Sequence, residues 1–292
     1  VSAIIDMTNA EINLSAGQIT SRKFKSTDIR GTLSISDDNV QFKDVNMKTS
    51  DGLFSLKGSI TSLEKPPYHL NINTAITNVD ISSLFYSFDN FQQKVVTHDN
   101  VKGKLTTRIN FDTQLKKDYS ILPESMRGKI ILQIKNGALV NLNALDELSK
   151  YVFKDRDFKH IEFAQLKDTL TLKGQQMELS RMEIQTSLLS LFVEGTYGFN
   201  GGTDISIQIP LSNLKKRDID YKPSNIGTDA KIGPSVFLRA VDGADGKIVF
   251  KYDPFKNYYK DKANKNKNQP KAQVDQQSIS ADQATDSKGK KK

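Results

Sequence analysis

Apolar and polar residues alternate along most of this chain, and that alternation limits the folds open to it more than any other feature. Between Tyr68 and Ile76, every second residue is apolar or threonine, and the residues between them are His, Asn and Ala. Ile205, Ile207 and Ile209 are likewise separated by polar residues or proline. A two-residue period is typical of strands with one dry and one wet face. We therefore predict a mainly β chain with about a dozen strands.

Turn signals between the alternating segments indicate an antiparallel meander. Ser50-Asp51-Gly52 and Asn136-Gly137 are of this kind. The segment 242–246, DGADG, is predicted to be a tight turn and not a calcium loop, because it lacks the further acidic ligand of an EF-hand. Two short helices are expected, one over residues 144–153 behind an Asn143 cap and one over residues 81–88 opened by Asp80.

An internal repeat supports a sheet that is built from hairpins. The segment VQFKDVNMKTSDGLFSLKGSI, which starts at Val40, aligns without gaps on MELSRMEIQTSLLSLFVEGTY, which starts at Met177. Apolar positions match, and so do two glycines, Gly58 and Gly195. We predict hairpin repeats near residues 29–79 and 128–211, which together would form an elongated, curved sheet.

Charge divides the chain into two regions. The net charge is +8, from 42 Lys+Arg and 34 Asp+Glu. Residues 256–292 contain ten Lys and four Asp, so residues 1–255 carry only +2 of that total. A nucleic-acid surface would need its cations on a folded face, and no nucleic-acid partner is expected. We predict a β-groove region over residues 1–255 and a disordered Lys-rich tail over 256–292.

The sequence contains no pattern that indicates catalysis. It has no cysteine, and its three histidines, His69, His98 and His160, are far apart and fit no metal-ligand spacing. Nucleophile elbows, phosphate-binding loops and dinucleotide motifs are absent from the sequence. We therefore expect no enzyme, no catalytic residue, no metal and no cofactor.

The dry faces must be hidden from water, because burying one Leu or Ile side chain is worth about 1.5–3 kcal/mol. They could pack on a second sheet as in a sandwich, face lipid as in a membrane barrel, or line a groove or closed barrel that holds an apolar ligand. The membrane barrel is the weakest of these, because most strands are short for it. Candidate lining residues are Phe54, Leu56, Leu70, Ile72, Ile109, Ile130, Leu132, Leu191, Val193, Ile205, Ile207 and Ile209.

Two long segments resemble the C-terminal region of the AsmA-like family of bacterial envelope proteins. They are NGALVNLNALDELSKYVF and IEFAQLKDTLTLKGQQMELSRMEIQTSLLSLFVEGTYGFNGGTDISIQIPL. Within the second, residues 163–166, 170–172, 177–186 and 189–199 fit the order of strands, polar turn and glycine in that family. Residues 10–58 look like the family's preceding hairpins, so the resemblance covers most of residues 1–250. The family's N-terminal membrane helix is missing here.

The resemblance implies a non-enzymatic protein whose apolar β-groove carries lipid acyl chains, in lipid transport to the outer membrane or in its assembly. The implied location is the bacterial periplasm, with anchoring to the inner membrane through a segment absent from this chain. The chain starts at Val1 and is interpreted as a fragment or a processed form. Predicted partners are phospholipid or another envelope lipid, and a membrane surface attracted by the Lys-rich tail. The alternative is a structural or adhesive β-sandwich that binds a protein or a glycan.

Overall fold

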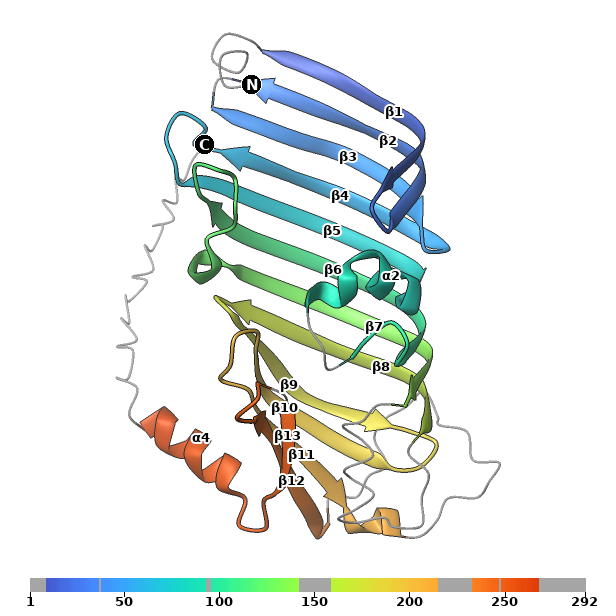
Figure 1. Ribbon diagram of the computed structural model, residues 1–292, viewed down its shortest axis with the longest axis vertical. Helices are drawn as coiled ribbons and strands as arrows, with labels where there is room; N and C mark the ends of the chain where they lie inside the picture. Colours follow the sequence, from blue (N-terminus) through green and yellow to red (C-terminus); the bar gives the residue numbers. More distant parts are fainter. Residues whose placement is uncertain are drawn as a thin grey trace, which may run out of the picture. The chain divides into compact units, whose positions relative to one another are not determined.

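The protein forms one open, curved antiparallel sheet of thirteen strands, in which the described strands follow one another in chain order (Figure 1). This computed structural model describes residues 9–36, 38–92, 96–141, 159–214, 233–246 and 248–267. The chain divides into two units, Val1–Tyr258 and Tyr259–Lys292, and the sheet belongs to the first. The strands are β1 (Ala10–Ser21), β2 (Phe24–Ser36), β3 (Asn39–Thr49), β4 (Gly52–Thr61), β5 (Tyr68–Asp80), β6 (Val101–Leu115), β7 (Arg127–Val140), β8 (His160–Lys173), β9 (Gln176–Gln185), β10 (Ser190–Gly198), β11 (Asp204–Pro210), β12 (Ser235–Asp242) and β13 (Ile248–Tyr252).

The predicted mainly β, antiparallel and curved architecture is confirmed. A sandwich needs two sheets packed face to face, whereas all thirteen described strands hydrogen-bond into one. Within the described residues, β1 and β13 are the two edges of that sheet. The predicted DGADG turn is also confirmed, because it joins β12 to β13 and is closed by a hydrogen bond from Gly246 N to the Gly243 carbonyl.

Bulges interrupt the ladder where Asp, Asn or Gly takes up a left-handed conformation. Asp28 (φ 53°), Asp44 (φ 47°) and Asn78 (φ 56°) lie within the register shifts of the β2–β3, β3–β4 and β5–β6 pairs. Gly103 (φ 127°) lies at the shift between β6 and β7. Asp and Asn tolerate positive φ better than other side chains, and a bulge bends its strand and increases the local twist. These positions therefore help to curve the sheet.

The sequence repeat corresponds to two hairpins with the same cross-strand register. In β3–β4, Phe42 pairs with Gly58, Val45 with Leu56 and Met47 with Phe54. In β9–β10 the equivalent residues pair in the same way, as Leu179 with Gly195, Met182 with Val193 and Ile184 with Leu191. Both ladders shift register at the same step, between the first and second of these pairs. The matching bulge is evidence for a true structural repeat, because alternation alone does not specify its position.

The described residues include two short α-helices. The predicted helix after Asp80 is α2 (Ile81–Ser87), and the Asp80 side chain accepts a hydrogen bond from Ser83 N at 2.8 Å. Short 3₁₀ turns lie at Asp89–Gln92, Pro123–Ser125 and Leu211–Leu214. The helix predicted behind Asn143 lies outside the described residues.

Helix α4 (Asn257–Lys267) is a correction to the predicted disordered tail. Its first N–H groups are satisfied by one carboxylate, because Asp253 accepts hydrogen bonds from Asn257 N at 2.8 Å and from Tyr258 N at 3.1 Å. The prediction rested on the scarcity of apolar residues, and it did not consider a cap from a residue that precedes the tail. Tyr258 is buried. The rest of the predicted tail, residues 268–292, lies outside the described residues.

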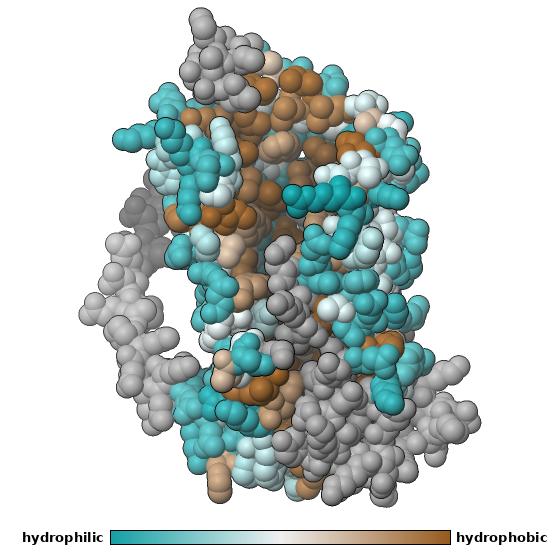
Figure 2. Space-filling view, in the orientation of Figure 1, coloured by the Kyte–Doolittle hydropathy of each residue, from teal (hydrophilic) through white to brown (hydrophobic). Residues whose placement is uncertain are grey.

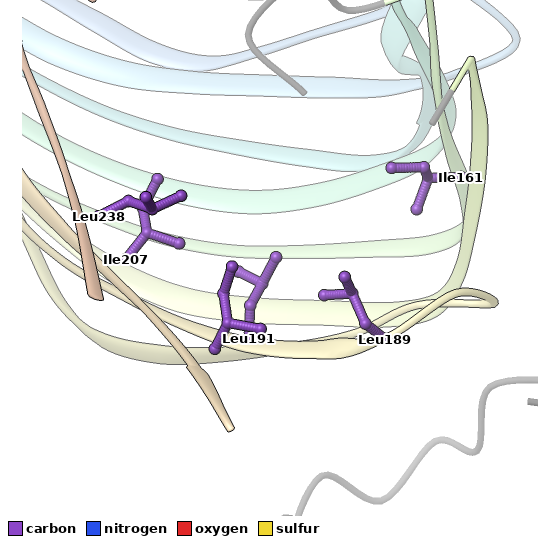
Figure 3. Close-up of a cluster of buried hydrophobic side chains, with 6 residues drawn as sticks. Ile161, Leu189, Leu191, Ile207 and Leu238 are labelled. Atoms are coloured by element: carbon purple, nitrogen blue, oxygen red, sulfur yellow. The ribbon is translucent and has the colours of Figure 1, made fainter. Parts of the chain in front are cut away.

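Two buried apolar clusters form the core. The first, here the C-terminal cluster, joins β8 to β10–β12, and Figure 3 shows its labelled side chains projecting into the concave side of the sheet (Figure 3). The second, here the helix cluster, lies where α2 packs on β5 and β6. The C-terminal cluster consists of Ile161, Leu189, Leu191, Ile207, Ile209 and Leu238, and the helix cluster of Ile76, Val79, Ile81, Leu84, Val101 and Leu105.

Candidate functional site: an apolar trough on the concave face

Cross-strand pairing aligns apolar side chains into rows that cross the sheet. Residues that are directly opposite in neighbouring strands share a face, so each chain of successive pairs defines one row. The first row passes from β1 to β10 through Ile12, Leu33, Phe42, Gly58, Ile72, Phe111, Gly128, Leu172, Met177 and Tyr197. The second passes from β3 to β13 through Val45, Leu56, Thr74, Ile109, Ile130, Leu170, Leu179, Gly195, Ile205, Ala240 and Phe250.

These rows form the floor of a trough. Figure 2 shows a hollow lined by hydrophobic residues over the upper strands of the view, with hydrophilic residues on both sides (Figure 2). The opposite face carries polar pairs, for example Lys57 with Asp44 at 2.7 Å and Asn71 Nδ2 with Asp112 Oδ2 at 3.0 Å. A strongly amphipathic sheet of this kind leaves apolar surface accessible along its concave side.

All twelve candidate lining residues lie on this apolar face, but the structure places them in two environments. Nine are half-buried: Phe54, Leu56, Leu70, Ile72, Ile109, Ile130, Leu132, Val193 and Ile205. Three are buried in the C-terminal cluster, with Leu191 7%, Ile207 8% and Ile209 0% exposed. The half-buried residues keep surface that a ligand could cover, whereas the three buried ones are part of the core.

Further lining residues are identified by pairing and were not among the candidates. Phe42 and Phe111 lie in the first row, and Val45, Leu170 and Leu179 lie in the second. The signal for them was present in the sequence as alternation, but their alignment with the candidates depends on hairpin register and on bulges. A bulge changes which residues share a face, and its position is not contained in a two-residue period.

Threonines interrupt the apolar rows in the middle of the sheet. Thr74 and Thr107 are 9% and 4% exposed, and Thr107 pairs with Ile76 on one side and with Leu132 on the other. The Thr107 hydroxyl has no hydrogen-bond partner among the described residues. The floor is therefore predominantly apolar, with isolated hydroxyls and no row of charge.

One rim of the trough is bridged by contacts between the β1–β2 hairpin tip and the segment after α2. Lys23 Nζ lies 2.7 Å from Asp89 Oδ1, and this hydrogen-bonded ion pair raises the pKa of Lys23 and lowers the pKa of Asp89. The rings of Phe24 and Phe88 lie 5.5 Å apart. The hairpin tip follows β1 and the segment after α2 follows β5, so β3 and β4 lie between them in strand order. The contact therefore spans the ends of β3 and β4.

The described residues show no group of side chains that could bind a metal ion. Among them, no three or more His, Asp or Glu side chains gather where they could hold a metal ion. His69 and His160 are exposed, and His98 contacts Asn90 and the ring of Tyr86. The part of the chain that the structure describes also contains no helix of the length and apolar character needed to cross a membrane.

Comparison with known proteins adds no relative from which a function could be transferred. The chain matches no protein-family model, no curated protein and no solved structure. The resemblance to the AsmA-like family therefore stays a prediction from the sequence, and a function has to be inferred chiefly from the geometry of the trough.

Proposed function

We propose that this protein is a non-enzymatic lipid-binding protein that holds acyl chains in the trough. The observation that carries the proposal is the predominantly apolar floor, made largely of half-buried side chains, on the concave face of one open sheet. Apolar surface left accessible to water favours an apolar ligand by about 25 cal/mol per Å² covered. Hydrocarbon chains suit a floor that offers almost no hydrogen-bonding groups.

The mechanism is passive. The acyl chains lie along the rows, and the headgroup stays at the polar rims in contact with water. From the sequence resemblance, the proposed role is in the bacterial periplasm, in lipid transport to the outer membrane or in outer-membrane assembly. The partners in this proposal are phospholipid or another envelope lipid. A membrane surface, attracted by the lysines of the C-terminal segment, is a second proposed partner.

Two adjacent isoleucines offer a matched test. Ile130 is half-buried and pairs with Ile109 and Leu170 in the second row, whereas Ile131 points to the other face and is 48% exposed. We expect Ile130→Glu to lose most of the phospholipid that co-purifies from a membrane-containing host. Ile131→Glu should retain it. Circular dichroism and thermal unfolding report whether each variant is folded.

The conservative variant Ile130→Thr keeps the test informative if the charged variant does not fold. Threonine preserves the branched shape and adds one hydroxyl, so reduced lipid with an intact fold is the expected result. Equal lipid content in wild type, Ile130→Thr and Ile131→Glu would contradict the proposal, because the ligand would then not contact the floor at this position.

A further inference from the structure

We infer that the lipid-binding part of the trough is blind-ended: it is open towards β1 and is closed by the C-terminal cluster. This inference rests on the proposed function and defines how much of the concave face can take a ligand. If the trough is closed at this end, the protein binds a limited number of acyl chains, and these chains do not extend past β10–β12.

The first observation is the change in burial along the sheet. At β1, the inner-face residues Ile12 and Leu14 are 43% and 40% exposed. The floor of β3 and β4 is half-buried, and that of β5 and β6 is buried where α2 packs on Ile76 and Leu105. At β11 and β12, Ile209 and Leu238 are 0% exposed. A side chain without accessible surface has nothing left for a ligand to cover, so the same apolar face changes from an open floor to a closed core.

The second observation is that the C-terminal cluster bridges the trough. Ile161 comes from the start of β8, whereas Leu191, Ile207 and Leu238 come from β10, β11 and β12. Figure 3 shows these side chains on the same, concave side of the sheet. Their packing joins the start of β8 to the last strands on the concave side of the sheet.

The third observation is a break in the ladder at the same place. β8 pairs with β7 from His160 to Lys173, but the β8–β9 pairing covers only the four pairs from Leu170–Leu179 to Lys173–Gln176. At the other end of the gap, Ser187 N donates to the Glu162 carbonyl at 2.7 Å. The two strands therefore diverge over the first part of β8, next to Ile161, while the rows still cross from β8 to β9 at Leu170–Leu179 and Leu172–Met177.

The open part has a length that suits hydrocarbon chains. From β2 to β8 there are six strand spacings, about 29 Å along the sheet. A bilayer core of about 30 Å contains two opposed acyl chains, so this floor accommodates about two chains end to end. A small and fixed number of chains per protein is the expected occupancy.

Site-specific photo-crosslinking tests the inference with side chains of similar shape. Phe42 and Phe111 lie on the open floor, and Phe250, at the end of the second row, packs against the C-terminal cluster. Each is replaced in the full chain by p-benzoylphenylalanine in a membrane-containing host, and lipid adducts are measured by mass spectrometry after illumination. Phe255, which is 70% exposed, serves as the control for non-specific membrane contact.

We expect lipid adducts at positions 42 and 111 in several-fold higher yield than at positions 250 and 255. Adducts at position 250 equal to those at 42 and 111 would overturn the blind end but leave lipid binding intact. Absence of adducts at all four positions, in variants that fold as judged by circular dichroism, would overturn the proposed function and this inference with it.

Discussion

At the scale of single residues, one residue type plays two roles on the same face of the sheet. Ile12 is 43% exposed at the β1 edge and Ile209 is 0% exposed in the C-terminal cluster. Ile209→Ala should destabilise the protein by about 2–5 kcal/mol, because it leaves a cavity in a packed core. Ile12→Ala should cost less than about 0.5 kcal/mol. Urea unfolding measures the loss of stability in each variant. Equal losses would contradict the assignment of Ile209 to the core and of Ile12 to the open floor.

Asp242 links the β10–β11 turn to β12 and gives a pH-dependent contribution to stability. Its Oδ2 atom accepts a hydrogen bond from Thr203 N at 2.8 Å, which lowers the pKa of the carboxyl group below its ordinary value. A carboxylate with a lowered folded-state pKa stabilises the protein above its unfolded pKa, about 3.9, and the contribution is lost as pH falls through the folded value.

We therefore expect the stability advantage of wild type over Asp242→Asn to shrink as pH falls below about 4. Urea midpoints measured from about pH 6 to about pH 3 give the comparison. A difference that stays constant over this range would show that the charge of Asp242 does not contribute through this contact.

At the scale of elements, α2 depends on one cap and covers the helix cluster. Its buried residues Ile81 and Leu84 pack with Ile76 and Leu105. Asp80→Ala removes the side-chain acceptor for Ser83 N and should cost about 1 kcal/mol. Asp80→Ser retains a capping oxygen and should recover most of the loss. Thermal unfolding distinguishes these outcomes, and no difference between the two variants would refute the capping role.

Local signals predicted some elements and not others. Alternation identified the strands and their dry faces, and Asp80 as the opening residue identified α2. The bulges at Asp28, Asp44 and Asn78 were not predicted, because the one-residue shift that a bulge makes in the alternation, as from Phe42 to Val45, does not distinguish a bulge from a turn. Helix α4 was missed because its N-terminus is capped by Asp253, which lies outside the polar segment.

At the scale of the whole molecule, the sequence could predict which residues share the apolar face but not which of them stay accessible. Phe54 and Leu191 occupy equivalent positions in the repeated hairpins, yet the first is half-buried and the second is 7% exposed. The difference arises from side chains brought together from β8 and β12, which lie far from Leu191 in sequence. Burial of this kind depends on tertiary contacts, and the two-residue alternation of a strand does not predict them.

The central claim is that the trough holds acyl chains, and native mass spectrometry of the full chain purified from a membrane-containing host tests it most directly. We predict a protein that carries bound phospholipid, released on denaturation and identified by lipid extraction, in a small and fixed number of molecules per chain. A stable, monodisperse protein free of lipid under the same conditions would contradict the claim.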